Sequence, residues 1–481
     1  MYLYDAARIA QHRTILISYR ICAGNKMRIS DILIRDKLFY KTVLMLALPI
    51  AAQQCITAGV NMVDTMMLGQ LGETALAASS AGTQVHNLFH FMSMGIGMGA
   101  GVMVSRYLGS GERNSLRKTI TLAFRACFII ASLYTLAVVL FTQQIMSFLA
   151  GDDHVVYEGI RYLRWSVPCY LLHGYTQLST ILLRSGRQMK IPLYSSIAAF
   201  FINIFANWVF IFGKLGAPAL GVAGAALGTL ISRIIECAFV AGYLLTKDES
   251  LSFRFSDVFK PCADLLPEYV KISIPVMISD TLLGIGNTMV VSIGGHIGRT
   301  YMAANSVTSV IRQFSSIFSQ SLGQPAVIIM GIALGINDRE RAFKEGFSLI
   351  ALSLVSGALL GAITWISSPF LVGIYKIEAE TAAVAMQLLH AMAVLMLFII
   401  PASVLTKGII RGGGDTRFLM IGDLIFLWCA SIPLGYAAGI IWHLEPFWIF
   451  FLLYIDNMLK CLLCLWRFST RKWMKIIKTA E

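Results

Sequence analysis

The sequence repeats itself at a distance of 226 residues. When residues 49–118 are shifted forward by that number, they align with the second half of the chain without a gap. Identical pairs include Pro49 with Pro275, Gly69 with Gly295, Gly72 with Gly298, Gly109 with Gly335, Arg113 with Arg339 and Lys118 with Lys344, and, at a distance of 227, Arg184 with Arg411. The repeats lie in long apolar runs, so we expect two membrane halves built on one plan, as in transporters with a pathway between the halves.

Composition places the chain in a bilayer. Hydrophobic residues make up 57% of it and charged residues 14%, whereas soluble proteins carry about 25% charged residues. The first 41 residues lack the apolar core of a cleavable signal peptide, and Met27 is a candidate alternative start because residues 1–26 match neither a span nor a motif. The net charge of +13 is spread over many short loops, which argues against a nucleic-acid partner.

The nine cysteines are scattered through the sequence and odd in number, so they predict no disulfide framework. Cys461 and Cys464 lie within one apolar run without a second pair, and we interpret them as small apolar side chains rather than as metal ligands. The glycine-rich segment 95–101 lacks the strand and the Lys-Ser/Thr of a phosphate-binding loop. Its alternate glycines instead favour close helix contact.

Apolar segments of about 20 residues predict an all-α polytopic membrane protein with twelve spanning helices. The spans are expected near 42–68, 79–104, 119–142, 162–183, 191–213, 220–246, 270–293, 301–330, 344–367, 381–406, 418–439 and 447–467.

Basic residues predict the orientation of these spans. With the N-terminus inside, the inner segments hold most of the Lys and Arg residues, including Arg184 and Arg411, whereas the outer loops hold only Lys214, Arg299 and Lys376. This alternation supports cytoplasmic N- and C-termini in the cell (plasma) membrane. Six spans per half make the two repeats parallel.

The predicted organisation follows from this count. Two six-helix lobes are expected, joined by a charged linker that Pro261 and Pro267 interrupt. The boundaries are residues 1–41 for a cytoplasmic N-terminal segment, 42–246 for the N-lobe, 247–269 for the cytoplasmic linker, 270–467 for the C-lobe and 468–481 for a basic cytoplasmic tail.

Asp64 is the most informative polar residue within the spans. A carboxylate at membrane depth costs about 2.5–3.5 kcal/mol on insertion scales, which is tolerated where it faces a wet cavity, pairs with a cation or holds a proton. Asn61 lies nearly one helical turn before Asp64, and Asn203 and Asn207 share a face of the fifth span. An Asp beyond the hydrocarbon edge and amides that only bond neighbouring helices are the alternatives at these positions.

Other polar residues are candidates for the lining of a cavity or a substrate site: Gln54, Gln177, Asp280 and Asn287. The spacing of Arg233 with Glu236 and of Asp456 with Lys460 predicts ion pairs within one helix. The membrane histidines, His86, His90, His173 and His390, are expected to act as structural hydrogen-bonding groups. Prolines such as Pro49 and Pro275 interrupt the spans and allow the helices to bend.

On these residues the chain resembles the multidrug and toxic compound extrusion (MATE) family over nearly all of 42–468. The motifs that carry the resemblance are LALPIAAQQCITAGVNMVDTMMLGQLGETALAA, GIGMGAGVMVSRYLGSGE, INIFANWVFIFG with GVAGAALGTLIS, and IIRGGGDTR. The resemblance implies a V-shaped pair of lobes and export of organic, often cationic and amphiphilic compounds, driven by inward H+ or Na+. It gives the cation-linked role in the first lobe to Asp64 and helix bending to Pro49.

One position departs from that family. Many relatives carry an Asp where this chain has Asn207, and an amide cannot titrate, so Asp64 is the only carboxylate expected in the cluster. The tenth span has no acidic residue of the kind that some relatives use for Na+. H+ and Na+ therefore both stay open as coupling ions.

The sequence thus predicts a secondary active antiporter that works by alternating access. We expect H+ or Na+ as the coupling ion, with binding of Na+ at Asp64 as one alternative, and no other metal or cofactor. The expected partners are small organic substrates and the lipid bilayer, and the chain is expected to be a monomer. A flippase for a lipid-linked precursor is the alternative function, although a cationic central cavity would be expected for it. A polytopic membrane enzyme would need a convergent catalytic constellation, which the sequence does not show, and a receptor or scaffold would leave the repeat and Asp64 unexplained.

Overall fold

The computed structural model describes residues 33–150, 152–375 and 377–475, and within these ranges the chain is helical without strands. The proposed start at Met27, residues 1–26 and residues 476–481 of the tail lie outside them. The first half contains α3 (Lys37–Gly69), α4 (Glu73–Ser110), α5 (Arg113–Leu140), α6 (Thr142–Leu149), α7 (Asp153–Ser185), α8 (Lys190–Phe212) and α9 (Val222–Thr246).

The second half begins after two short 3-10 helices in the linker, η1 (Phe255–Phe259) and η2 (Ala263–Leu265). Its elements are α10 (Leu266–Ile297), α11 (Arg299–Gly335), α12 (Arg339–Gly373), α13 (Ala379–Ser403), η3 (Val404–Ile410), α14 (Thr416–Leu424), η4 (Ile425–Ser431), α15 (Ile432–Tyr436), η5 (Ala437–Ile441), α16 (Pro446–Leu453) and α17 (Asp456–Ser469). Here η3, η4 and η5 are π-helical turns inside longer helices.

Each of the twelve predicted spans corresponds to a helix or a run of helices. Ten of the described helices are long and apolar enough to cross a membrane, and the bent pair α16 and α17 makes an eleventh. The remaining predicted span is α7, a continuous 33-residue helix whose sequence contains many polar side chains. The polytopic all-α prediction is confirmed, although the helices extend beyond the apolar segments and the short α6 has no counterpart among the predicted spans.

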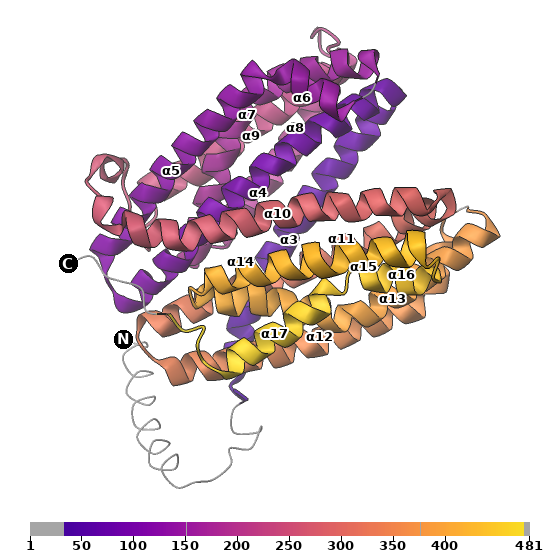
Figure 1. Cartoon of the computed structure of the whole chain (residues 1–481). Helices are drawn as coiled ribbons and strands as arrows, with labels where there is room; N and C mark the ends of the chain where they lie inside the picture. Colours follow the sequence, from indigo (N-terminus) through magenta and orange to yellow (C-terminus); the bar gives the residue numbers. More distant parts are fainter. Residues whose placement is uncertain (1–32, 151, 376, 476–481) are drawn as a thin grey trace.

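The two halves form two lobes that diverge from one end of the molecule (Figure 1). The first helix of each repeat contributes to both lobes. The early part of α3 packs in the C-lobe core through Val43 and Ala47, whereas its later part lies along α8. The early part of α10 packs in the N-lobe core through Ile272 and Val276, and its later part joins the C-lobe through Val290.

The lobes meet where α4 and α11 end, beside the basic turns. A Cβ atom added to Gly335 would lie 2.2 Å from the Arg106 carbonyl oxygen and 3.0 Å from the Cα of Gly109, and one added to Gly331 would lie 2.5 Å from the Ser105 Cβ. Gly109 with Gly335 and Ser105 with Gly331 are repeat-related pairs. Glycine is therefore required here because the two main chains are in contact across the lobe boundary.

Basic side chains strengthen this junction. The Arg106 guanidinium is buried and donates to the carbonyl oxygens of Gly412, at 3.3 Å, and Lys475, at 2.5 Å. Arg184 and Arg411 lie beyond the ends of the predicted spans, yet both belong to helical segments, with 7% and 2% of their surface exposed. The helices continue past the apolar runs, and partners from other helices satisfy these two cations.

The segment between the lobes packs against the N-lobe. Asp248 and Phe253 are fully buried, and the Arg125 guanidinium of α5 donates to the carbonyl oxygens of Val258 and Lys260. Much of the linker therefore packs against the N-lobe.

Candidate functional site

Asp64 faces helix α8, where it accepts a hydrogen bond from an amide. The Asn207 Nδ2 atom lies 2.5 Å from the Asp64 Oδ1 atom and 3.2 Å from the Asn203 Oδ1 atom. Asn203 in turn donates to the Thr229 hydroxyl of α9 over 3.5 Å. The i,i+4 spacing of the two asparagines places them on one face, and this face lies against the carboxylate of α3.

The two asparagines are almost completely enclosed, with exposed fractions of 2% for Asn203 and 0% for Asn207, whereas Asp64 is half-buried. A glycine makes this arrangement sterically feasible, because a Cβ added to Gly228 of α9 would lie 2.1 Å from the Asn207 Oδ1 atom. That oxygen is buried and has no hydrogen-bond partner within the described chain. The cluster therefore holds an acceptor oxygen beside a carboxylate, which are the ligand types that small hard cations prefer.

Asp64 has no ion pair among the described residues, in contrast to Glu236, Asp280, Asp423 and Asp456. Glu236 pairs with Arg233 at 2.5 Å, which confirms the predicted i,i+3 pair. Asp280 pairs with Arg411, and Lys460 pairs with both Asp423 and Asp456, the second of which confirms the predicted i,i+4 pair. The single amide of Asn207 stabilises the Asp64 carboxylate without neutralising its charge.

A small cavity of about 30 Å³ lies next to this cluster, where α3, α8 and α9 meet. Its lining includes Asn61, Asn203, Arg233 and Glu236. Its volume is about that of one water molecule. Asn61 and Asn203 therefore line the same small polar cavity.

A chain of polar contacts extends from this cavity to the other lobe. The Ser196 hydroxyl donates to Glu236 and accepts from the Gln53 amide. The Arg184 guanidinium donates to Gln53 and, across the lobe boundary, to Gln324 of α11. This connection was not predicted, because it depends on which faces of α3, α7 and α11 meet.

The remaining candidates lie elsewhere. Asp280 is 5% exposed and accepts two hydrogen bonds from Arg411, at 3.0 and 3.1 Å, so its carboxylate is engaged in an ion pair. Its position in a cavity lining stays a prediction. Gln54 and Gln177 are half-buried and Asn287 is exposed. Within the described ranges these three side chains do not take part in the Asp64 network.

Three histidines that are distant in sequence come together inside the N-lobe. The His90 Nδ1 and His173 Nε2 atoms lie 3.1 Å apart, and the ring centroids of His86 and His173 are separated by 4.6 Å. The described residues contain no group of three or more His, Cys, Asp or Glu side chains suited to a metal ion. The expected hydrogen-bonding role agrees with the His90–His173 contact. The spacing of the three histidines in the sequence did not predict that they would cluster.

Comparisons with known proteins agree with the repeat and the fold. The MatE family model matches residues 49–209 and again 275–437. The "Uncharacterized transporter YisQ" of Bacillus subtilis is 25% identical over 92% of this chain and 96% of its own length. The "Multidrug resistance protein NorM" of Vibrio vulnificus is also 25% identical, over 86% and 92%.

Solved structures show the same architecture. The "Crystal structure of MATE in complex with MaL6" has a TM-score of 0.82 at 16% identity and covers 90% of this chain and 97% of that one. The "Outward-facing conformation of a multidrug resistance MATE family transporter of the MOP superfamily" has a TM-score of 0.81 at 17% identity, covering 90% and 96%.

Proposed function

Because the chain belongs to the MatE family of membrane transporters, we propose that it is a secondary active antiporter that exports organic, cationic amphiphilic compounds in exchange for H+ or Na+. It is a transporter and not an enzyme. Relatives named as multidrug resistance proteins along most of the chain support efflux of toxic compounds.

Asp64 carries the coupling role in this proposal. The supporting observation is that this carboxylate accepts a hydrogen bond from one amide, that of Asn207, while Glu236, Asp280, Asp423 and Asp456 already pair with cations. A carboxylate without a fixed counter-ion can exchange H+ or Na+ during a cycle, whereas one that is locked in a salt bridge cannot do so without breaking the bridge. Asn61, Asn203 and Asn207 provide the polar surroundings for the exchange.

The arrangement of the lobes supports an outward-open state. The basic turns mark the cytoplasmic end by the positive-inside rule, and the lobes are in contact at that end through Gly109 and Gly335. Binding of a cation at Asp64 removes its charge, and α3 then bends near Pro49, where the proline removes a main-chain donor. Separation of the lobes at the cytoplasmic end requires the Arg184–Gln324 and Arg106–Gly412 contacts to break.

The proposal places the chain in the plasma membrane as a monomer with both termini in the cytoplasm. A flippase for a lipid-linked precursor remains the competing function, but three of the membrane cations do not favour it. Arg233 and Lys460 form ion pairs, and Arg312 donates to the Tyr454 hydroxyl. These three side chains are thus engaged by the protein rather than open to a pyrophosphate.

The discriminating experiment is export of a fluorescent cationic compound from proteoliposomes, with a proton gradient and a sodium gradient imposed separately. One of the two gradients should drive export. If neither drives export while a lipid-linked pyrophosphate analogue is flipped, the antiport proposal is refuted in favour of its competitor.

A further inference from the structure

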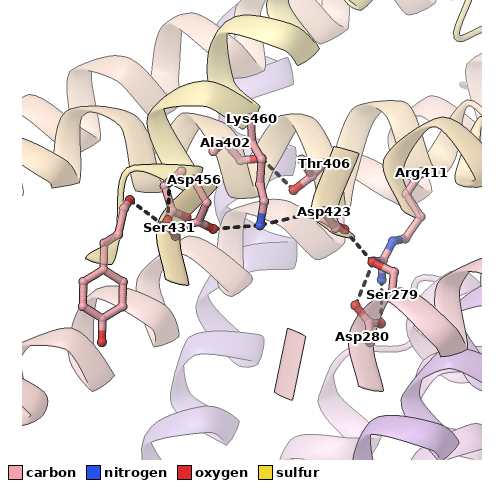
Figure 2. Close-up of polar contacts among 11 residues, drawn as sticks. Ser279, Asp280, Ala402, Thr406, Arg411, Asp423, Ser431, Asp456 and Lys460 are labelled. Atoms are coloured by element: carbon pink, nitrogen blue, oxygen red, sulfur yellow. Dashed lines mark hydrogen bonds and ion pairs between the residues drawn. The ribbon is translucent and has the colours of Figure 1, made fainter. Parts of the chain in front are cut away.

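Five charged side chains are buried near one another in the C-lobe, as one ion pair and one group of three (Figure 2). We call this group the C-lobe charge network; its members are Asp280, Arg411, Asp423, Asp456 and Lys460. Their exposed fractions are all 7% or less. They come from α10, the end of η3, α14 and α17, so the network connects four segments at the centre of the lobe.

Lys460 occupies the middle of a two-carboxylate site. Its Nζ atom lies 3.2 Å from the Asp423 Oδ1 atom and 2.9 Å from the Asp456 Oδ2 atom. Asp423 and Asp456 belong to different helices, α14 and α17, and the ammonium joins them (Figure 2).

The other oxygen of each carboxylate is bound separately. The Ser279 hydroxyl donates to the Asp423 Oδ2 atom, and the Ser431 hydroxyl donates to the Asp456 Oδ1 atom over 3.1 Å. Asn457 also donates to the Asp456 Oδ1 atom, at 3.1 Å. The hydroxyls and the amide thus fix both carboxylates so that one oxygen of each faces a single cation position, which Lys460 fills.

The local backbone explains why a carboxylate is stable there. The helix axis bends by 42° between α16 and α17, and Asp456 is the first residue of α17. The N-terminus of a helix favours a negative charge. As the first residue of α17, Asp456 has no partner within that helix for its main-chain N–H, which instead donates to the Ser431 hydroxyl over 2.9 Å.

We propose that Asp423 and Asp456 form a monovalent-cation site that the chain itself fills permanently with the Lys460 ammonium. A covalently tethered cation cannot leave with the cycle, and two buried carboxylates need a positive charge between them. Arg411 compensates Asp280 in the same lobe through two hydrogen bonds. This step rests on the proposed function, in which Asp64 is the coupling carboxylate. Exchange of the ion is then confined to the N-lobe.

The test replaces the tethered cation with a neutral side chain of similar length. In Lys460→Met, the vacated site should take a free cation. The thermal unfolding midpoint of the purified variant should then rise by about 3 °C or more in about 100 mM NaCl relative to choline chloride of equal ionic strength, or on mild acidification. Wild type and Lys460→Arg should lack this dependence, and Asp423→Asn/Lys460→Met, which keeps only one of the two carboxylates, should lack the dependence on Na+.

A Lys460→Met variant whose midpoint depends on Na+ and pH as the wild type does would overturn the proposal. If this variant fails to accumulate, the neutral triple variant Asp423→Asn/Asp456→Asn/Lys460→Met decides. Its recovery supports charge compensation by Lys460, and its failure to accumulate would overturn that role. Because the readout is stability, its outcome is independent of the transport assay that tests Asp64.

Discussion

The side-chain amide of Asn207 donates to the Asp64 Oδ1 atom over 2.5 Å, and this contact joins α8 to the carboxylate of α3. A carboxylate buried inside a membrane protein loses its hydrogen bonds to water, and hydrogen-bond donors of the protein must replace them. Asn207 therefore keeps Asp64 oriented in its cluster while leaving its charge free for a cation.

Replacement of Asn207 by leucine should remove this donor without adding charge. We expect export to fall roughly tenfold or more, a loss of at least about 1.4 kcal/mol, which is close to the lower end of the range of about 1.5–3 kcal/mol for one hydrogen bond to a charged group. Asn207→Asp keeps the polarity and should retain more export than the leucine variant. Initial rates of dye efflux from cells, normalised to the amount of protein in the membrane, measure both; equal rates in Asn207→Leu and wild type would exclude a role for the amide.

Gly228→Ala should disturb the same cluster from the other side. The added methyl group would lie 2.1 Å from the Asn207 Oδ1 atom, so the asparagine must move away from Asp64. Efflux should decrease severalfold, with a lower thermal midpoint. The matched control is Gly242→Ala on the same helix, where a Cβ would meet no atom within 4 Å and efflux should remain at the wild-type level. Similar behaviour of the two variants would show that crowding of Asn207 has no consequence.

Separating Asp280 from Arg411 should destabilise the C-lobe. Asp280→Asn or Arg411→Gln each leaves an uncompensated buried charge, at a cost of about 3–5 kcal/mol. The double variant removes both charges and should recover much of this loss. Thermal unfolding in detergent measures the three proteins, and single and double losses that simply add up would mean that the two side chains are not coupled.

Gly335→Ala should loosen the junction of the lobes. Its methyl group would lie 2.2 Å from the Arg106 carbonyl oxygen, so the main chains of α4 and α11 must separate. Hydrogen–deuterium exchange should rise in the turns at 109–114 and 336–338. Gly373→Ala on α12, with no atom within 4 Å of the added Cβ, is the control. Unchanged exchange in Gly335→Ala would contradict a tight closed junction.

Periodicity and charge predicted much of this molecule. The apolar runs indicated the spanning helices because hydrocarbon thickness fixes their length, and the i,i+4 spacing of Asn203 and Asn207 indicated their common face. These inferences depend on one helix at a time, which is the scale at which the sequence is informative.

Contacts between helices were harder to predict. Arg184 and Arg411 resemble loop cations because each follows an apolar run, yet both are buried against partners on other helices. The histidine cluster and the bridge from Lys460 to Asp423 depend on how α4, α7, α14 and α17 rotate against each other. No spacing along the chain encodes that rotation, and one sequence contains no record of which faces meet.

The most direct test of the central claim is movement of the coupling ion driven by substrate. Proteoliposomes that contain wild type or Asp64→Asn, reconstituted at equal amounts, are given an opposing gradient of an exported compound, and the uptake of H+ or Na+ is followed. The account predicts ion uptake in the wild type and none in Asp64→Asn, while that variant still folds and binds the compound. Ion uptake by Asp64→Asn at the wild-type rate would contradict the assignment of coupling to this carboxylate.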